Sequence, residues 1–233
     1  MIMRLFRSLL DFFLPRYCKV CNKRLSIGEE HLCLGCYVSM PLVEWNPEDG
    51  YSPAERILLS EKTVQRAASV IKYDKDSNYR KILYHLKYYN HPEVGVWLAR
   101  IGAEKLAASG FFDGIDMIVP VPLSKRKMRR RGYNQSSYIA YGIRKVTGLP
   151  VYEDVLSRTK GRSRQAGLGR FQRWKNASGL YSVARPECLN GKHVLLVDDV
   201  MTTGATLCSI IQTVNETNPD VKFSVFTLAI VTG

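Results

Sequence analysis

The chain has 233 residues, of which 45% are hydrophobic and 24% charged, a composition that excludes a disordered, fibrous or membrane-spanning protein and predicts one main domain with a small accessory module. Its formal net charge is +13, and segment 123–175 carries the whole excess, with 15 Lys and Arg against only Glu153 and Asp154. Such concentration favours a site for a polyanion over the alternative, a solvated basic surface.

The first 14 residues mix basic and apolar side chains. The apolar ones recur at helical spacing, at Leu5, Phe6, Leu9 and Phe13. This spacing predicts an amphipathic helix packed on its own protein, with contact to a membrane surface as the alternative. Charged residues interrupt the apolar run and no small-residue cleavage site follows, so the segment does not read as a signal peptide. We therefore expect a cytoplasmic protein with no transmembrane segment.

Four of the six cysteines form two CxxC pairs, Cys18–Cys21 and Cys33–Cys36. Two such pairs supply the four thiolates that structural Zn²⁺ prefers, and they leave no open position for catalysis. The alternative is a pair of disulfides, which would require an oxidising compartment. The pattern predicts a structural zinc module with Cys18, Cys21, Cys33 and Cys36 as ligands, whereas Cys188 and Cys208 read as small buried residues.

A connector rich in proline and acidic residues spans 41–63. We place residues 1–55 (helix, zinc module and connector) in one unit and 56–233 in the main domain. In the main domain, strand and helix patterns alternate. We expect strands at 67–73, 117–121, 151–155, 193–197 and 223–230, and helices at 79–88, 94–109, 135–146 and 205–216. This order predicts an α/β fold with a mostly parallel sheet, which binds ligands at the carboxyl ends of its strands.

The segment KHVLLVDDVMTTGATL, residues 192–207, carries the most specific chemistry. It begins as a buried parallel strand that we expect to end at Asp198 and Asp199. The glycine, the backbone amides and the threonine hydroxyls that follow form an anion cradle before a helix. The acidic pair can accept hydrogen bonds from ribose hydroxyls and, through water, help to hold Mg²⁺ on a diphosphate. The alternative is a plain strand-to-helix turn. The expected ligand contacts are Asp198, Asp199, Val200, Met201, Thr202, Thr203, Gly204, Ala205 and Thr206.

Val197 to Leu207 resembles the phosphoribosyl-diphosphate signature of type I phosphoribosyltransferases. The stretch VPVPLSKRKMRRRGYNQSSYIA after Ile118 is similar to one in the ComF family, whose members are associated with bacterial DNA uptake. Shorter elements of that family lie in the same order along the chain, with Leu86-Lys87-Tyr88 before this stretch and Leu156, Arg158, Thr159, Gln165, Arg173 and Asn176 after it. Asn90 departs from the glycine expected after Lys-Tyr. The resemblance implies a type I phosphoribosyltransferase-like parallel sheet flanked by helices, behind the four-cysteine module.

The resemblance also assigns roles to the two basic stretches. The first follows the strand at 117–121 and corresponds to a diphosphate-binding loop, with Arg131, Gly132 and Asn134 as contacts. The second, 158–175, corresponds to a flexible loop that closes over substrate. Six cations within 125–131 exceed what one diphosphate needs. A polyanion-binding surface without chemistry is therefore kept as the alternative. Candidate nucleic-acid contacts are Lys125, Arg126, Lys127, Arg129, Arg130, Arg162, Arg164, Arg170 and Arg173, with Tyr133, Phe171 and Trp174 as aromatic neighbours.

Two functions follow from this resemblance. The first is a ComF-type protein that binds phosphoribosyl diphosphate with Mg²⁺ and handles incoming single-stranded DNA during natural transformation, with competence-machinery proteins as partners. The alternative is an active phosphoribosyltransferase of nucleotide salvage or biosynthesis that transfers ribose 5-phosphate to a base, with Asp198, Asp199 and Arg131 as catalytic groups. Thr202 stands where purine-using relatives often carry a carboxylate, which argues against a 6-oxopurine acceptor.

Overall fold

The computed structural model describes residues 14–46, 48, 50–159 and 180–231. The expected N-terminal amphipathic helix therefore lies almost wholly outside the described residues. The second basic stretch, 158–175, also lies mostly outside the described residues. Its residues outside the described part include Arg162, Arg164, Gln165, Arg170, Phe171, Arg173, Trp174 and Asn176.

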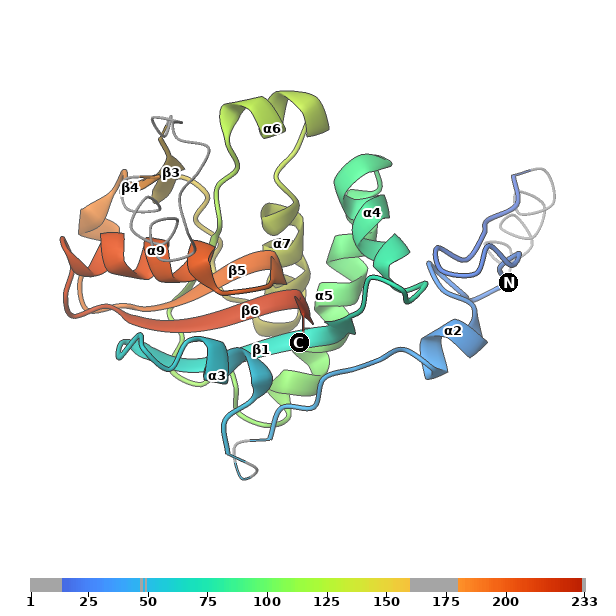
Figure 1. The fold of residues 1–233 in the computed structure, drawn as a ribbon, viewed down its shortest axis with the longest axis horizontal. Helices are drawn as coiled ribbons and strands as arrows, with labels where there is room; N and C mark the ends of the chain where they lie inside the picture. The colour runs from blue at the N-terminus through green and yellow to red at the C-terminus, as the bar shows by residue number, and fades with distance from the viewer. Residues whose placement is uncertain (1–13, 47, 49, 160–179, 232–233) are drawn as a thin grey trace.

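The main sheet has four parallel strands in the order β1-β6-β5-β2. They are β1 (Val64–Tyr73), β2 (Met117–Pro120), β5 (His193–Met201) and β6 (Lys222–Val231). Each pairs in parallel with its neighbour, so all four carboxyl ends lie at one edge (Figure 1). The middle of β1 and nearly all of β6 are buried because both faces of the sheet are covered.

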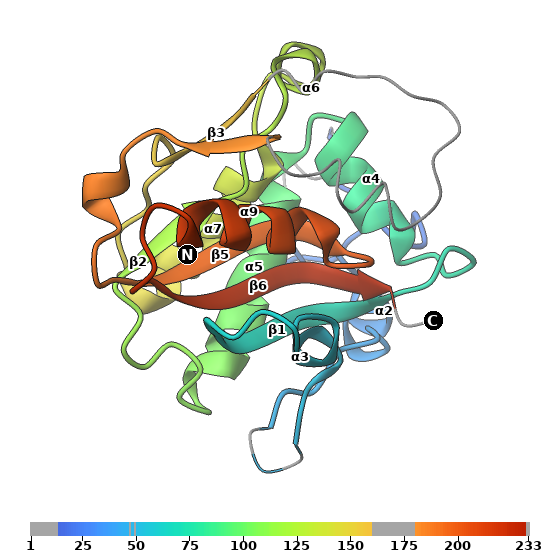
Figure 2. The same cartoon turned by 60° about the vertical axis from the view of Figure 1, so that its left-hand side comes forward.

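Helices cover the two faces in separate layers (Figure 2). On one face α5 (Pro92–Ala107) packs along α7 (Gln135–Thr147), and both join a core cluster with Leu195 and Val197 of β5. On the other face α9 (Ala205–Asn215) packs on the alternate β5 residues Val194 and Leu196. The short helix α3 (Pro53–Ile57) lies on this second face too. The expected parallel sheet flanked by helices is confirmed.

The four main strands and the helices of the main domain form close to the expected positions, with two corrections. β5 does not end at Asp198 and Asp199, because the ladder to β6 continues as far as Met201, which pairs with Ile230. The strand expected at 151–155 was wrong. Only Val151 makes a bridge, to Ile118.

Two acidic side chains make contacts where the chain leaves the sheet after Val151. The Glu153 carboxylate accepts a hydrogen bond from Ser137, and Asp154 pairs with Arg185 at 2.6 Å. The chain then forms a separate antiparallel pair of short strands, β3 (Leu156–Arg158) and β4 (Tyr181–Val183). A short 3₁₀ helix, η2 (Pro186–Cys188), leads from there toward β5.

The stretch expected as a diphosphate loop contains a helix, α6 (Lys125–Arg131). The Ser124 side chain accepts a hydrogen bond from the Lys127 amide at its start, which satisfies one of the free amides of the first turn. Gly132 ends the helix with φ 80°, a conformation that glycine adopts without steric cost. Three of the six cations occupy the last turn, where the helix dipole favours positive charge.

The cysteine module packs against α4 (Arg80–Tyr88) and α5. Lys81 donates a hydrogen bond to the carbonyl of Val20 at 2.9 Å, and the Tyr79 hydroxyl donates to that of Cys36 at 2.7 Å. The ring of His31 meets Trp97 edge-on, with centroids 5.5 Å apart. The module and α4 therefore share one core. A second short helix, α2 (Leu34–Val38), begins directly after Cys33.

The connector between the module and the main domain is attached to the sheet. The Val43 amide donates to Val70 at 2.9 Å, and the Lys72 amide donates to Pro41 at 2.8 Å, so this segment borders β1. The unit boundary near residue 55 stays a prediction. None of the helices in the described ranges has the length and apolar content needed to cross a bilayer.

Candidate functional site

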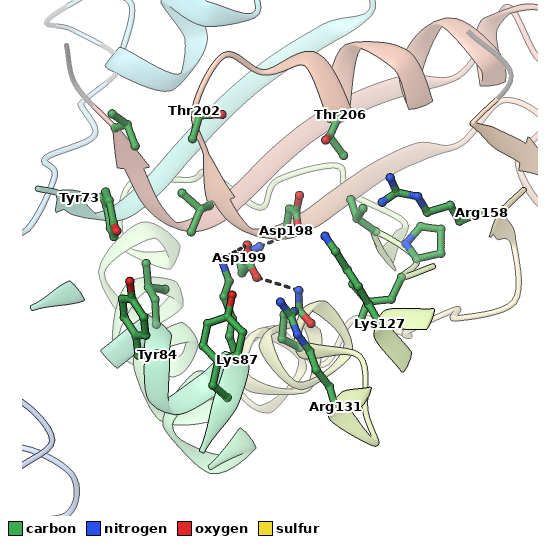
Figure 3. A pocket seen from close by; sticks show the side chains of 18 of the residues that line it. Tyr73, Tyr84, Lys87, Lys127, Arg131, Arg158, Asp198, Asp199, Thr202 and Thr206 are labelled. Carbon is green, nitrogen blue, oxygen red and sulfur yellow. Dashed lines mark hydrogen bonds and ion pairs between the residues drawn. The ribbon is translucent and has the colours of Figure 1, made fainter. Parts of the chain in front are cut away.

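A cleft of about 400 Å³ opens at the carboxyl ends of the four strands (Figure 3). The strand ends contribute its floor, the loop before α9 borders one side, and α4 and α6 border the other. This is where an open α/β sheet binds ligands. The polar and aromatic lining residues are Tyr73, Tyr84, Lys87, Tyr88, Lys127, Arg131, Gln135, Arg158, Tyr181, Asp198, Asp199, Thr202 and Thr206.

Asp198 and Asp199 lie in the cleft but have different surroundings. Neighbouring residues of a strand point to opposite faces. The buried Asp199 pairs with Lys87 of α4 at 3.1 Å and accepts a hydrogen bond from Gln135 of α7 at 2.7 Å (Figure 3). Asp198 accepts from the Ser136 hydroxyl at 3.1 Å and from the Asp199 amide at 2.8 Å. Asp199 thus connects the sheet to both helices, and Asp198 is the acid with more freedom to meet a ligand.

The pKa of Asp198 is raised to about 7, first by burial of its carboxyl and then by the negative charge of Asp199. Hydrogen bonds from Ser136 and the Asp199 amide act in the opposite direction without cancelling the rise. At neutral pH the protonated and ionised forms of this carboxyl are therefore both populated, and a ligand that carries a cation or hydroxyl donors would favour the ionised form.

Asp198→Asn is expected to stabilise the ligand-free protein at high pH. A carboxyl with a raised folded-state pKa keeps its proton in the folded state up to about pH 7 and loses it near pH 4 when unfolded. Its ionisation cost is therefore absent below pH 4, grows between these values and is complete above pH 7. The melting temperature of the variant should exceed that of the wild type clearly at pH 8 and hardly at pH 4. An equal gain at both values would contradict the raised pKa.

Lys87 pairs with Asp199, but within the described residues Lys127 and Arg131 form no ion pair with either acid. Burial, together with the charges of Arg158 and Arg131, lowers the pKa of Lys127. The Nε and Nη1 atoms of Arg131 are buried and have no hydrogen-bond partner within the described residues. Such donors are costly to leave unpaired, at about 1–3 kcal/mol or more for a charged group. An anion bound in the cleft would satisfy the guanidinium and relieve the repulsion.

The loop from Thr202 to Gly204 turns the chain from β5 into α9. Gly204 caps α9 with φ 71°, and a side chain here would bring its Cβ within 2.6 Å of Ile57 in α3. Only glycine allows both the turn and the contact with α3. Thr202 and Thr206 are exposed on either side of this turn. The free amides of the first turn of α9 form the positive end of its dipole, which favours a bound anion.

The structure brings some of the expected ligand contacts to the cleft and leaves others outside its lining. Asp198, Asp199, Val200, Thr202, Thr206 and Arg131 line it. The lining does not include Met201, Thr203, Gly204, Ala205, Gly132 or Asn134. The Asn134 side chain instead caps α7 through the Ser136 amide and donates to the Val121 carbonyl. Direct ligand contacts by this second group stay predictions.

Several lining residues carried no predicted role as ligand contacts: Tyr84, Lys87, Tyr88, Gln135, Arg158 and Tyr181. The clearest signal for Lys87 was a cation on the apolar side of an amphipathic helix, one turn after the buried Leu83. Lys127, expected as a nucleic-acid contact, also lines the cleft. Lys125, Arg126, Arg129 and Arg130 are exposed on α6.

The four cysteines of the module form one cluster. Their Sγ atoms lie within 4.8 Å of one another, and those of Cys21 and Cys33 are 3.7 Å apart. Tetrahedral coordination with Zn–S bonds of about 2.3 Å places sulfur atoms about 3.8 Å apart, so this donor set fits zinc. Burial opposes the Cys18 thiolate, but backbone hydrogen bonds from Cys21, Cys33 and Val20 outweigh it and lower the pKa of Cys18 to about 7.

Comparison with known proteins bears on the fold and the cleft. The family model described as "Phosphoribosyl transferase domain" matches residues 162–230. The chain is 27% identical to "DNA utilization protein YhgH" of Salmonella typhi over 208 residues, covering 85% of this chain and 90% of the relative. It is 34% identical over 96 residues to "Competence protein F" of Haemophilus influenzae, covering 41% and 42% of the two chains.

Among solved structures, the allosteric regulatory enzyme of purine biosynthesis superposes with a TM-score of 0.37 and 21% identity. The superposition covers 57% of this chain and about a quarter (26%) of the enzyme. This is a loose likeness, whereas the family match includes β5, the 202–206 loop and α9.

The matched family and the parallel sheet with its acid pair and threonine loop define a phosphoribosyltransferase-like protein. The two relatives, whose names refer to DNA utilization and competence, make the assignment more specific. The chain is a ComF-like protein with a phosphoribosyltransferase-like domain.

Proposed function

We propose that the cleft binds phosphoribosyl diphosphate with Mg²⁺ and that the protein uses this site in DNA uptake, where it handles single-stranded DNA. One observation carries the first part: the acid pair, the threonine loop and the unpaired Arg131 guanidinium meet in one cleft. The cleft thus offers acceptors for ribose hydroxyls, a cradle for one phosphate and cations for a second anionic group.

Each part of the ligand has a matching region. The 5′-phosphate is assigned to the loop between Thr202 and Thr206 at the start of α9. The ribose hydroxyls are assigned to Asp198, and the diphosphate to the cations Lys127 and Arg131 on α6. Bound Mg²⁺ would neutralise part of the diphosphate charge, and the acid pair offers oxygen atoms of the kind that Mg²⁺ prefers, directly or through water.

A thermal-shift series tests ligand binding. Phosphoribosyl diphosphate with Mg²⁺ should raise the melting temperature of the wild type, since a ligand that binds only the folded state stabilises it. Ribose 5-phosphate should give a smaller shift, because it lacks the diphosphate. If the full ligand causes no shift at saturating concentration, the assignment fails.

The DNA part of the proposal rests on the names of the two relatives and on the exposed cations of α6. Arg126, Arg129 and Arg130 are exposed outside the cleft lining and can contact phosphates of a strand. Binding should weaken with salt by about 0.7 logarithmic units per contact and per tenfold salt increase. Replacing these three residues with glutamine should reduce that slope. Salt-insensitive binding would contradict a phosphate contact surface.

An active transferase is the second candidate, because the family model described as "Phosphoribosyl transferase domain" matches residues 162–230. A turnover assay with labelled phosphoribosyl diphosphate, Mg²⁺ and a panel of bases separates the two readings. Diphosphate release that depends on a base assigns a transferase, and binding without release assigns a binding protein.

The cytoplasmic location and the competence-machinery partners expected from the sequence stay predictions. Zinc in the four-cysteine cluster is proposed with them, and metal analysis of the purified protein tests it.

A further inference from the structure

The outer face of α4 carries two exposed tyrosines beside the cleft. Tyr84 and Tyr88 are 44% and 56% exposed, while Ile82, Leu83 and Leu86 of the same helix are buried. The two tyrosines lie one helical turn apart, with ring centroids 5.7 Å apart and planes tilted by 45°. Both line the cleft, and so does Tyr73 at the end of β1. A soluble protein gains nothing in folding from keeping such rings in water, which suggests a ligand for them.

The aromatic face of α4 meets the cations of α6. The guanidinium groups of Arg130 and Arg131 lie 5.8 Å and 5.4 Å from the ring centroid of Tyr88. In both overall views α4 and α6 project from the same side of the sheet (Figures 1 and 2). One opening is therefore bordered by aromatic rings on one helix and by cations on the other, which is the combination that binds single-stranded nucleic acid.

We propose that Tyr84 and Tyr88 form a stacking platform for the nucleobases of single-stranded DNA whose phosphates contact α6. This inference rests on the proposed DNA function and adds the subsite that holds the bases. A duplex does not fit, because its bases are already stacked and present no free face. The exposed cations Arg126, Arg129 and Arg130 outside the cleft lining favour a strand over a free base, since a free base carries no phosphates for them to contact.

The role of each ring follows from its position. Tyr88 is 56% exposed and has both guanidinium groups within 5.8 Å of its ring centroid, so a base stacked on the exposed part of the ring would extend a cation–ring–base column. Tyr84 lies one turn closer to the start of α4 and offers the next ring to a neighbouring base. Stacking needs only the ring faces, so the platform should accept different bases and should not require the tyrosine hydroxyls.

Fluorescence anisotropy with two labelled strands of equal length tests the platform. One strand carries thymines, and the other carries abasic sites on the same backbone. Tyr84→Ala with Tyr88→Ala should weaken binding of the thymine strand by on the order of tenfold or more, as expected for lost base stacking, and should leave the abasic strand nearly unchanged. Tyr84→Phe with Tyr88→Phe should keep wild-type affinity. Tyr89→Ala is the matched control, because Tyr89 is 62% exposed next to Tyr88 but does not line the cleft.

The outcomes separate the platform from the broader DNA role. If the double alanine variant lost equal affinity for the two strands, or none for the thymine strand, the platform would be overturned. Salt-dependent binding by the wild type would then still support the DNA role. No binding of either strand by the wild type would overturn both. A titration with free thymidine forms the remaining arm: a double alanine variant that loses thymidine binding but keeps full affinity for the strand would assign the rings to a free base and overturn the proposal.

Discussion

Cys33→Ser should destabilise the protein strongly and weaken ligand binding at a cleft that contains no cysteine. The Cys33 thiol belongs to the four-sulfur cluster, and α2 begins immediately after it. Structural zinc contributes about 10–16 kcal/mol to the folding of small zinc peptides, so losing one of four thiolates should cost several kcal/mol. For a chain of this length each kcal/mol corresponds to about 2–4 °C in melting temperature. A fall of about 10 °C or more is expected in a thermal melt.

The effect should extend to α4 through specific contacts. Lys81 and Tyr79 donate hydrogen bonds to backbone carbonyls of the module, at Val20 and Cys36. When the module loosens, these donors lose their partners and α4 loses part of its support. Amide hydrogen exchange should therefore rise in α4 as well as in the module, and affinity for phosphoribosyl diphosphate should fall. Loosening confined to the module would contradict this coupling.

A second cysteine provides the matched control. Cys188 lies in η2, is partly buried and does not belong to the cluster. Cys188→Ser should leave the melting temperature, the metal content and the exchange of α4 close to wild type. Chelation of the wild-type protein should reproduce the effect of Cys33→Ser and should add little to the variant.

Lys87→Met should lower stability and ligand affinity together. The Lys87 ammonium neutralises the buried Asp199 carboxylate at 3.1 Å, with side-chain exposures of 22% and 9%. Removing one partner of a buried ion pair leaves an uncompensated charge and typically costs about 3–5 kcal/mol. This loss of stability should be large because the Asp198 carboxyl is a second acid beside Asp199. Urea denaturation should show the loss as a lower midpoint, and calorimetry should show weaker binding of phosphoribosyl diphosphate.

A double variant separates the two effects of Lys87. Asp199→Asn removes the charge that Lys87→Met leaves unpaired, while its amide oxygen can still accept the Gln135 hydrogen bond. The double variant should therefore recover most of the stability. It should not recover ligand affinity, because the cleft still lacks the lysine. Full recovery of both would show that Lys87 acts only as a structural counter-ion, and no recovery of stability would contradict the ion-pair account.

The local sequence predicted the turn from β5 into α9 well because short-range interactions determine its structure. Strand, acid pair, glycine turn and helix follow one another in 192–207, and the structure contains all four in that order. The inequality of the two acids was not predictable in the same way. It arises from their partners, because Asp199 contacts Lys87 and Gln135, whereas Asp198 contacts Ser136 and the Asp199 amide. The pairing of Asp199 with Lys87 depends on where α4 lies in space.

The basic segment shows a different reason for a missed element. Lys125 to Arg131 contains neither an apolar stripe nor an acidic first turn, the features that identify most amphipathic helices. Its helix depends on the Ser124 cap, the Gly132 end and the position of the cations at the helix C-terminus. The family resemblance implied a diphosphate-binding loop at this position. The CxxC spacing, by contrast, predicted the cysteine cluster directly, although nothing local indicated that the cluster packs on α4.

Isothermal titration calorimetry with phosphoribosyl diphosphate tests the central claim most directly. With Mg²⁺ present, the wild-type protein should bind one ligand per chain, and leaving out Mg²⁺ should weaken binding markedly. Replacing both acids, with Asp198→Ala and Asp199→Ala, should abolish the heat while circular dichroism shows that the fold persists. No heat with the wild type, or equal affinity in the folded double variant, would contradict a ribose-phosphate site in this cleft.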